Sequence, residues 1–322
     1  MYRKIMDFLE EWKNEEHRKP LILQGARQVG KTYAILEFGR THYENVAYFN
    51  FETNPKLNET FEENISPDYL IPILSHIAGQ TIVTEKTLIV FDEIQLCERA
   101  LTSLKYFYEE RPDYHIIVAG SLLGVAVNRA RFSFPVGKVD MKTLYPMDLE
   151  EFMIAMGENS LVDQIKKCFE TNESMPSALH DAAMQLYRQY LVVGGMPECV
   201  MQFAETKDYI LIRHTQDTIL ASYLNDMSKY NNLNEIKKTR LAYDNITVQL
   251  SKKNTRFQYK LIKKGGRASE FENAIEWLCL SGIVSQVYKV EQIRKPLENY
   301  RDIDAFKIYV SDLGLLCAKK DI

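Results

Sequence analysis

The 322-residue chain has little glycine and proline, few cysteines and no long apolar run. Only 14 Gly and 10 Pro stand beside 46% hydrophobic residues, so collagen-like, disordered and low-complexity chains are excluded. No stretch approaches the roughly 18 apolar residues that a membrane span needs. The first 20 residues hold several carboxylates and no apolar core, which argues against a secretory signal.

The five cysteines are odd in number, widely spaced and never arranged as CxxC. This pattern argues against a disulfide framework or a structural zinc site and favours a reducing compartment. Neither sign of charge dominates, because 40 basic residues face 44 acidic ones. Any nucleic-acid contact must therefore come from a local patch. We expect a soluble, cytoplasmic protein with two or three domains.

Short apolar runs alternate with helical stretches over the first 145 residues or so. Spacing of Ile5, Phe8, Leu9 and Trp12 predicts an initial amphipathic helix. The apolar runs, which should form strands covered on both faces, are 21–23, 46–51, 88–91 and 116–119. This alternation predicts an α/β domain with three layers and a mainly parallel sheet.

The pattern changes after Tyr145-Pro146. Residues 148–156 are expected to be helical, and 157–177 to form a polar connection. Successive helices follow over 178–250, with breaks at Gly194-Gly195 and in 231–234.

Near the C-terminus, a helix over 268–281 precedes two β-like runs, 283–290 and 306–310. Helices followed by a hairpin suggest a winged-helix module. We therefore predict a first domain at 1–156, a helical connection at 157–233 and a winged-helix-like domain at 234–322.

The clearest motif is a GxxxxGK[ST] phosphate loop between the first strand and the following helix. Its glycines allow backbone N–H groups to surround a polyphosphate at a helix N-terminus. Lys31 is expected to reach the β- and γ-phosphates, and the Thr32 hydroxyl to ligate Mg²⁺. The predicted nucleotide-binding residues are Gly25, Ala26, Arg27, Gln28, Val29, Gly30, Lys31, Thr32 and Tyr33.

A second motif places two adjacent carboxylates, Asp92 and Glu93, at the end of a buried strand. Buried carboxylates are costly unless a cation or water meets them. Asp92 is therefore the expected second Mg²⁺ ligand, and Glu93 the group that activates an attacking water. The alternative, a solvated acidic turn, loses weight because a complete phosphate loop accompanies the pair.

Two more polar residues end predicted strands. Ser121 could contact the γ-phosphate or the water, because strand C-terminal ends line the ligand crevice in such sheets. It could equally cap the next helix. Asn50 could hydrogen-bond Glu93 and restrain it, although a loop-forming role is the stronger interpretation.

Together these segments resemble prokaryotic AAA+-type ATPases. The resemblance covers nearly the whole chain. It is carried by 25–32, 50–52, 91–95, 119–124, 133–139, 144–147, 194–198 and 257–260. It implies ATP as the nucleotide and a C-terminal domain of unknown function. Family members usually continue into a restriction-endonuclease-like module, which this sequence does not include after 309–316, so nuclease activity is not expected.

One family feature cannot be assigned. AAA+ assemblies often insert an arginine from a neighbouring subunit into the γ-phosphate site. The candidates are Arg129, Arg131 and Lys138, and solvated charges are the stronger interpretation for both arginines. A hexameric ring is therefore not predicted.

A basic segment between Ser251 and Ser269 carries seven cations and no acidic residue. Its cations are Lys252, Lys253, Arg256, Lys260, Lys263, Lys264 and Arg267. They could neutralise phosphates of DNA, while Glu270, Glu272 and Glu276 on the next helix argue against base readout. A solvated face, docking against acidic surface of the same protein, or contact of Arg267 with the nucleotide are the alternatives.

The sequence thus predicts a Mg²⁺-dependent ATPase that couples hydrolysis to conformational change, with non-specific DNA or a protein as a possible partner. A nucleotide-gated binding module with little turnover is the main alternative. A small-molecule kinase is weaker, because no acceptor site is evident.

Overall fold

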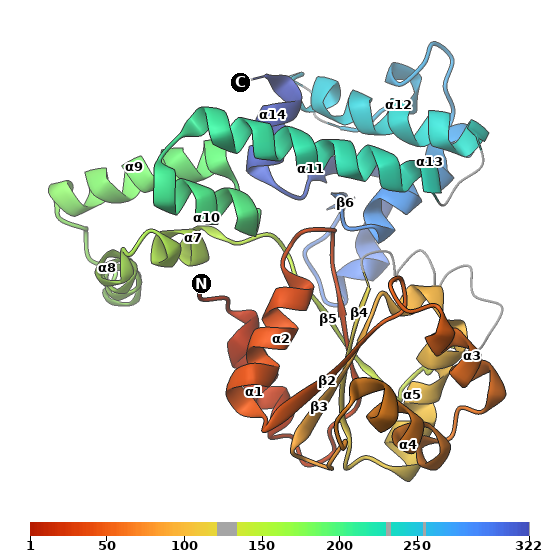
Figure 1. Cartoon of the computed structure of the whole chain (residues 1–322). Coiled ribbons are helices and arrows are strands. Elements are labelled where there is room, and N and C mark those ends of the chain that lie inside the picture. The colour runs from red at the N-terminus through yellow and green to blue at the C-terminus, as the bar shows by residue number, and fades with distance from the viewer. Residues whose placement is uncertain (121–133, 230–232, 254–255, 322) are drawn as a thin grey trace. The chain divides into compact units, whose positions relative to one another are not determined.

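A computed structural model describes residues 1–120, 134–229, 233–253 and 256–321. The chain divides into two compact units. Tyr2–Tyr145 form the N-terminal unit, and Pro146–Ile322 form the C-terminal unit together with Met1. Figure 1 labels helices and strands of both units.

The N-terminal unit is built on a parallel sheet of five strands in the order β2-β3-β4-β1-β5. The strands are β1 (Leu21–Gln24), β2 (Asn45–Asn50), β3 (Thr87–Asp92), β4 (His115–Gly120) and β5 (Asp140–Thr143). Every residue of β3 and β4 is buried, as their apolar runs require. The predicted α/β class and parallel sheet are confirmed.

Helices cover both faces of this sheet, which gives three layers (Figure 1). On one face lie α1 (Ile5–Lys13) and α2 (Lys31–His42). The other face carries α3 (Lys56–Glu63), α4 (Pro67–Ala78) and α5 (Glu98–Glu110), with the one-turn helix η1 (Ile94–Leu96) at the end of β3. Phe61 and Phe91 meet edge to face at 5.7 Å in the core under α3. Phe61 of α3 thereby packs against Phe91 of β3, the residue directly before Asp92.

The C-terminal unit is mostly helical. Its helices are α7 (Leu149–Ala155), α8 (Asn159–Thr171), α9 (Ser177–Val193), α10 (Pro197–Thr206), α11 (Tyr209–Lys229), α12 (Leu233–Leu250), α13 (Ala268–Leu280) and α14 (Leu313–Lys320). A hairpin of β6 (Val284–Val290) and β7 (Arg301–Val310) follows α13, with short turns η2 (Tyr259–Leu261) and η3 (Leu297–Tyr300) nearby.

One predicted boundary and one predicted connection differ from the structure. The first unit ends at Tyr145 rather than 156, because α7 packs with α8, α9 and α10 of the C-terminal unit. The supposed polar connection 157–177 contains α8, whose Leu161 and Val162 are buried against Met153. The helix was not predicted because most residues of α8 are polar, and only a short apolar stripe packs against the rest of the unit.

The end of the chain keeps the predicted order of helix and hairpin. β7 is longer than predicted and pairs antiparallel with β6. Phe257 N–H donates to Phe306 O at 2.8 Å, so the segment before η2 joins the hairpin edge. The winged-helix assignment stays a prediction. In the described part of the chain, no helix combines the length and apolar character needed to cross a bilayer.

Candidate nucleotide site

The phosphate loop has a backbone that only glycine tolerates at its start. Gly25 has φ 148°, and a Cβ there would lie 2.2 Å from Leu144 O. Gly30, with φ 89°, comes directly before the first residue of α2. Both glycines are therefore required by geometry: Gly25 by close backbone approach and Gly30 by its left-handed turn into the helix.

Lys31 lies inside this loop, with only 8% of its surface exposed. Its Nζ donates to Gly25 O at 2.9 Å and Ala26 O at 2.8 Å. Burial lowers the pKa of Lys31 to about 8, against the opposing effect of Glu93 and Asp92. Phosphate oxygens are stronger partners for an ammonium than carbonyls, so a polyphosphate at the loop can draw Nζ away from them.

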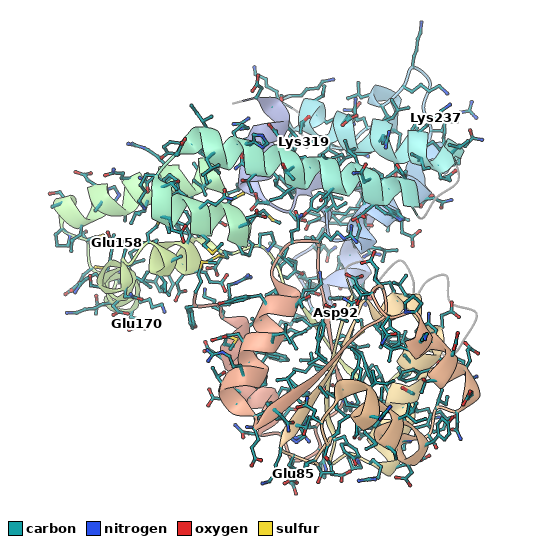
Figure 2. All side chains as sticks on the ribbon, in the orientation of Figure 1. Glu85, Asp92, Glu158, Glu170, Lys237 and Lys319 are labelled. Atoms are coloured by element: carbon teal, nitrogen blue, oxygen red, sulfur yellow. The ribbon has the colours of Figure 1, made fainter. Side chains whose placement is uncertain are left out.

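Asp92 connects the loop to the end of β3. Its Oδ2 accepts from Thr32 Oγ1 at 2.9 Å and from Tyr48 OH at 2.7 Å. Figure 2 places Asp92 and Glu85 at opposite ends of β3. Thr32 and Asp92, which lie 60 residues apart in sequence, therefore bring a hydroxyl and a carboxylate oxygen within 2.9 Å of each other, and oxygen is the donor that Mg²⁺ prefers.

Glu93 follows Asp92 in a left-handed conformation, with φ 53°. Its backbone N–H donates to Asp92 Oδ1 at 3.0 Å, and its carboxylate accepts from the Gln95 amide. Burial raises the pKa of Glu93, while the Gln95 hydrogen bond lowers it. The turn sends the two adjacent carboxylates to separate partners.

The Asn50 side chain does not bond Glu93, the weaker of its two interpretations from sequence. Asn50 Nδ2 donates to Tyr48 OH at 3.2 Å, and Asn50 Oδ1 accepts from the backbone N–H groups of Glu52 and Thr53. The loop-forming role is the one observed, because the Asn side chain closes a local turn. Asn50 pairs with Asp92 in the sheet, and its side chain is linked to the Asp92 carboxylate through Tyr48.

Some predicted residues cannot be placed. Ser121, Arg129 and Arg131 lie outside the described residues. Lys138, the third candidate for a γ-phosphate contact, pairs with Glu109 at 3.0 Å.

Tyr48 and Gln95 belong to the site although the sequence analysis did not select them. Tyr48 and Asn50 are two residues apart on β2, and strand alternation places them on one face. That spacing was the available signal for Tyr48. Gln95 lies in the 91–95 run that carries the family resemblance, but its contact was not predictable, because its orientation depends on the left-handed turn at Glu93.

The basic segment of the C-terminal unit is exposed, and some of its cations have hydrogen-bond or ion-pair partners. Arg256 donates to Asp304 O at 2.9 Å. Within the described chain, five of its side chains have no hydrogen-bond or ion-pair partner: Lys252, Lys253, Lys260, Lys264 and Arg267. Arg256, Lys260 and Arg267 line a groove of about 610 Å³ together with the acidic Asp304.

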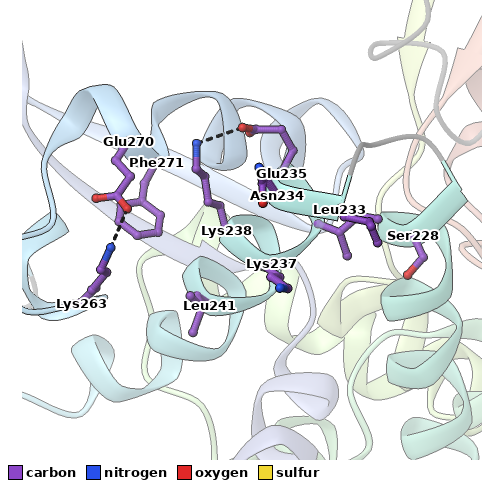
Figure 3. Close-up of a pocket in the computed structure, with 11 residues that line it drawn as sticks. Ser228, Leu233, Asn234, Glu235, Lys237, Lys238, Leu241, Lys263, Glu270 and Phe271 are labelled. Atoms are coloured by element: carbon purple, nitrogen blue, oxygen red, sulfur yellow. Dashed lines mark hydrogen bonds and ion pairs between the residues drawn. The ribbon is translucent and has the colours of Figure 1, made fainter.

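Lys263 is a different case, and Figure 3 shows why. It lines a cavity of about 1130 Å³ next to α12, where its Nζ pairs with Glu270 at 3.1 Å. Lys238 in the same cavity pairs with Glu235 at 3.0 Å. The charges of this cavity are thus largely neutralised among themselves, which makes Lys263 the weakest phosphate-binding candidate of the basic segment.

Comparisons with known proteins support this fold. Residues 17–153 match the family model described as "AAA domain", and residues 184–322 match a domain of unknown function, DUF8612. No curated protein matches the chain. A Walker-type ATPase of Pyrococcus abyssi is similar in structure, with a TM-score of 0.58 and 13% identity, over 99% of this chain and 95% of that one.

Two further solved structures have lower scores. The Aeropyrum pernix ORC1 protein in complex with DNA has a TM-score of 0.36 and 13% identity, over 99% of this chain and 91% of that one. A Thermotoga maritima RuvB variant has a TM-score of 0.37 and 14% identity, over 91% and 88%. The fold assignment depends on the first structure and on the family model.

Proposed function

We propose that the chain binds ATP with Mg²⁺ and hydrolyses it to ADP and phosphate, because residues 17–153 match the family model described as "AAA domain". The observation that carries this proposal is the meeting of Lys31, Thr32 and Asp92 at one end of the sheet, with Glu93 beside them. Together they supply a phosphate-binding cation, a pair of metal-binding oxygens and a base.

Thr32 and Asp92 are the residues that would hold Mg²⁺. Their donor set fits a hard cation, because a hydroxyl and a carboxylate oxygen already lie 2.9 Å apart. A bound Mg²⁺ neutralises charge on the phosphates. Tyr48 donates to the same Asp92 oxygen and orients it.

Glu93 is proposed to take a proton from the attacking water. Its carboxylate is partly buried, lies next to Asp92 and accepts a hydrogen bond from the Gln95 amide, while Arg27 and Lys31 favour its charged form. The ionised carboxylate keeps lone pairs available for water beside the Gln95 hydrogen bond. This favours hydrolysis over a module that merely holds the nucleotide, which remains the alternative.

A second candidate function is non-specific nucleic-acid binding by the basic segment. It is favoured by five cations that have no hydrogen-bond or ion-pair partner in the described part of the chain: Lys252, Lys253, Lys260, Lys264 and Arg267. Contacts of this kind position a backbone and do not read bases.

One assay separates these possibilities. ATP turnover is measured with Mg²⁺ in the presence of duplex DNA, single-stranded DNA, RNA or no nucleic acid, with analogue binding measured in parallel. Turnover that disappears on chelation of Mg²⁺ supports the ATPase. Tight nucleotide binding with negligible turnover in every condition supports the gated module, and absence of nucleotide binding overturns both.

A further inference from the structure

At the candidate base, Glu93, one polar atom of the Gln95 side chain is hydrogen-bonded and the other is not. Its amide nitrogen donates to Glu93 Oε2. Its carbonyl oxygen, Oε1, is buried and has no hydrogen-bond partner among the described residues. A buried unpaired carbonyl is uncommon in folded proteins and calls for a reason.

The reason lies in the charge of Glu93. Turning the amide over would place the carbonyl oxygen against the carboxylate, which in its ionised form has no proton to donate. A hydrogen bond to an ionised acceptor is stronger than a hydrogen bond between neutral groups. The observed orientation therefore serves Glu93 and leaves Oε1 unpaired.

Gln95 is also held on a firm support. It is the middle residue of η1, and the neighbouring Ile94 is fully buried in the core. Leu96 N–H donates to Glu93 O at 3.0 Å, and Cys97 N–H donates to Ile94 O at 2.9 Å. The backbone of η1 is thus tied to the end of β3, and from it the Gln95 amide holds one oxygen of the carboxylate.

We infer that Gln95 is the positioning residue for Glu93: it holds Oε2 and thereby leaves Oε1 of the carboxylate to accept the proton of the attacking water. This inference rests on the proposed ATPase function. It assigns to Gln95 the role of orienting Glu93, a carboxylate that Asn50 does not contact.

The informative variant is Gln95→Met, which keeps the length of the side chain and removes both its donor and its unpaired acceptor. We expect the melting temperature to stay the same or rise, and affinity for a non-hydrolysable ATP analogue to stay the same. We expect kcat to fall about tenfold, less than the roughly 10²–10⁴-fold cost of losing a general base. Leu96→Met, on the same turn but exposed, is the control and should keep parental kcat.

A purely structural role for Gln95 predicts the reverse, a lower melting temperature with unchanged kcat, and that result overturns the inference. The contact is also tested without nucleotide. In the ¹H–¹⁵N spectrum of the apo protein, the Gln95 side-chain amide signal should be shifted downfield and protected, and both properties should be lost in Glu93→Ala. An unchanged signal overturns the contact. If the parent protein hydrolyses no ATP, the proposed function fails, while the spectrum still decides whether Gln95 holds Glu93.

Discussion

The backbone N–H of Gly195 donates a 2.6 Å hydrogen bond to the side chain of Asp312, 117 residues further along the chain. The other carboxylate oxygen accepts from Leu315 N–H at 2.8 Å and caps α14. Gly195 has no room for a side chain, since a Cβ would lie 2.0 Å from Met147 O. The Gly194-Gly195 break between α9 and α10 is thus the point at which distant parts of the C-terminal unit are joined.

Asp312→Asn should destabilise the C-terminal unit. The amide nitrogen of Asn would face a backbone donor in place of an acceptor, in a site that is 4% exposed. We expect the free energy of unfolding to fall by about 1–3 kcal/mol, the usual cost of an unpaired buried group. Urea unfolding followed by circular dichroism measures this. The exposed Asp163→Asn in α8 is the control, and equal stabilities of the two variants would contradict the role of Asp312.

Lys31→Ala should abolish nucleotide binding or turnover. The variant removes the side-chain cation that the loop directs at the β- and γ-phosphates, while the loop backbone keeps its glycines. Fluorescent ATP titration and phosphate release are the measurements. Lys56→Ala, an exposed lysine of the same unit, should behave like the parent. Parental binding and turnover in Lys31→Ala would mean that the nucleotide site is elsewhere.

Glu93→Gln should bind ATP normally and lose most hydrolysis, because an amide cannot accept the proton of water. A loss of about 10²–10⁴-fold in kcat is expected for a general base. Single-turnover phosphate release, with analogue affinity as the control, separates this from a binding defect. If kcat is unchanged while binding is intact, the base is another group and the gated-module alternative gains support.

Much of the N-terminal unit could be predicted from sequence because its signals are local. The apolar runs of β3 and β4 and the glycines of the phosphate loop each specify a structure within a few residues. β5 (Asp140–Thr143) has no apolar run, because it is an edge strand that pairs only with β1. It is held there by pairing with a strand more than 100 residues earlier, which no local pattern encodes.

The candidate site divides in the same way. Lys31, Thr32 and Asp92 were predictable, since each belongs to a motif with a fixed spacing. The partner of Glu93 was not, because it depends on the direction of one side chain after a left-handed turn at φ 53°. The loop-forming role preferred for Asn50 is the one observed, because its carbonyl oxygen accepts from the two backbone N–H groups that follow it and its amide nitrogen donates to Tyr48 OH.

His115 should make the N-terminal unit sensitive to acid. Burial lowers the pKa of His115 to about 3, with further lowering by Arg18 and Lys13, from an ordinary value of 6.5. Between these two pH values the unfolded chain binds more protons than the folded one. Stability therefore falls as the pH falls from 6.5 towards 3, by at most about 1.4 kcal/mol per pH unit.

The test replaces His115 by Asn, which removes the titrating group and its bond to Tyr43 OH. The variant should be less stable at pH 7 but lose less stability between pH 6.5 and 4.5. Trp12 fluorescence in a Trp277→Phe background reports on this unit alone, since Trp12 lies in α1 and contacts the His115 ring edge to face. Parallel pH profiles for His115→Asn and its parent would show that His115 does not titrate in this range.

The last prediction concerns nucleic acid at the basic segment. If its cations contact phosphates, binding should weaken steeply with salt, with a log–log slope of about −0.9 per contacted phosphate of duplex DNA. Replacing Lys260 and Arg267 together by Gln should make the slope shallower by about 1.8 and weaken all sequences alike. Lys263→Gln is the matched control: Lys263 is already paired with Glu270, so its slope should change less. Fluorescence anisotropy of a labelled duplex at several salt concentrations gives these slopes.

If the same cations instead contact another surface of this protein, the double variant changes ATP turnover or stability and leaves DNA affinity as it was. Absence of binding at roughly 50 mM salt, where phosphate contacts are strong, would rule out DNA as the partner of this segment.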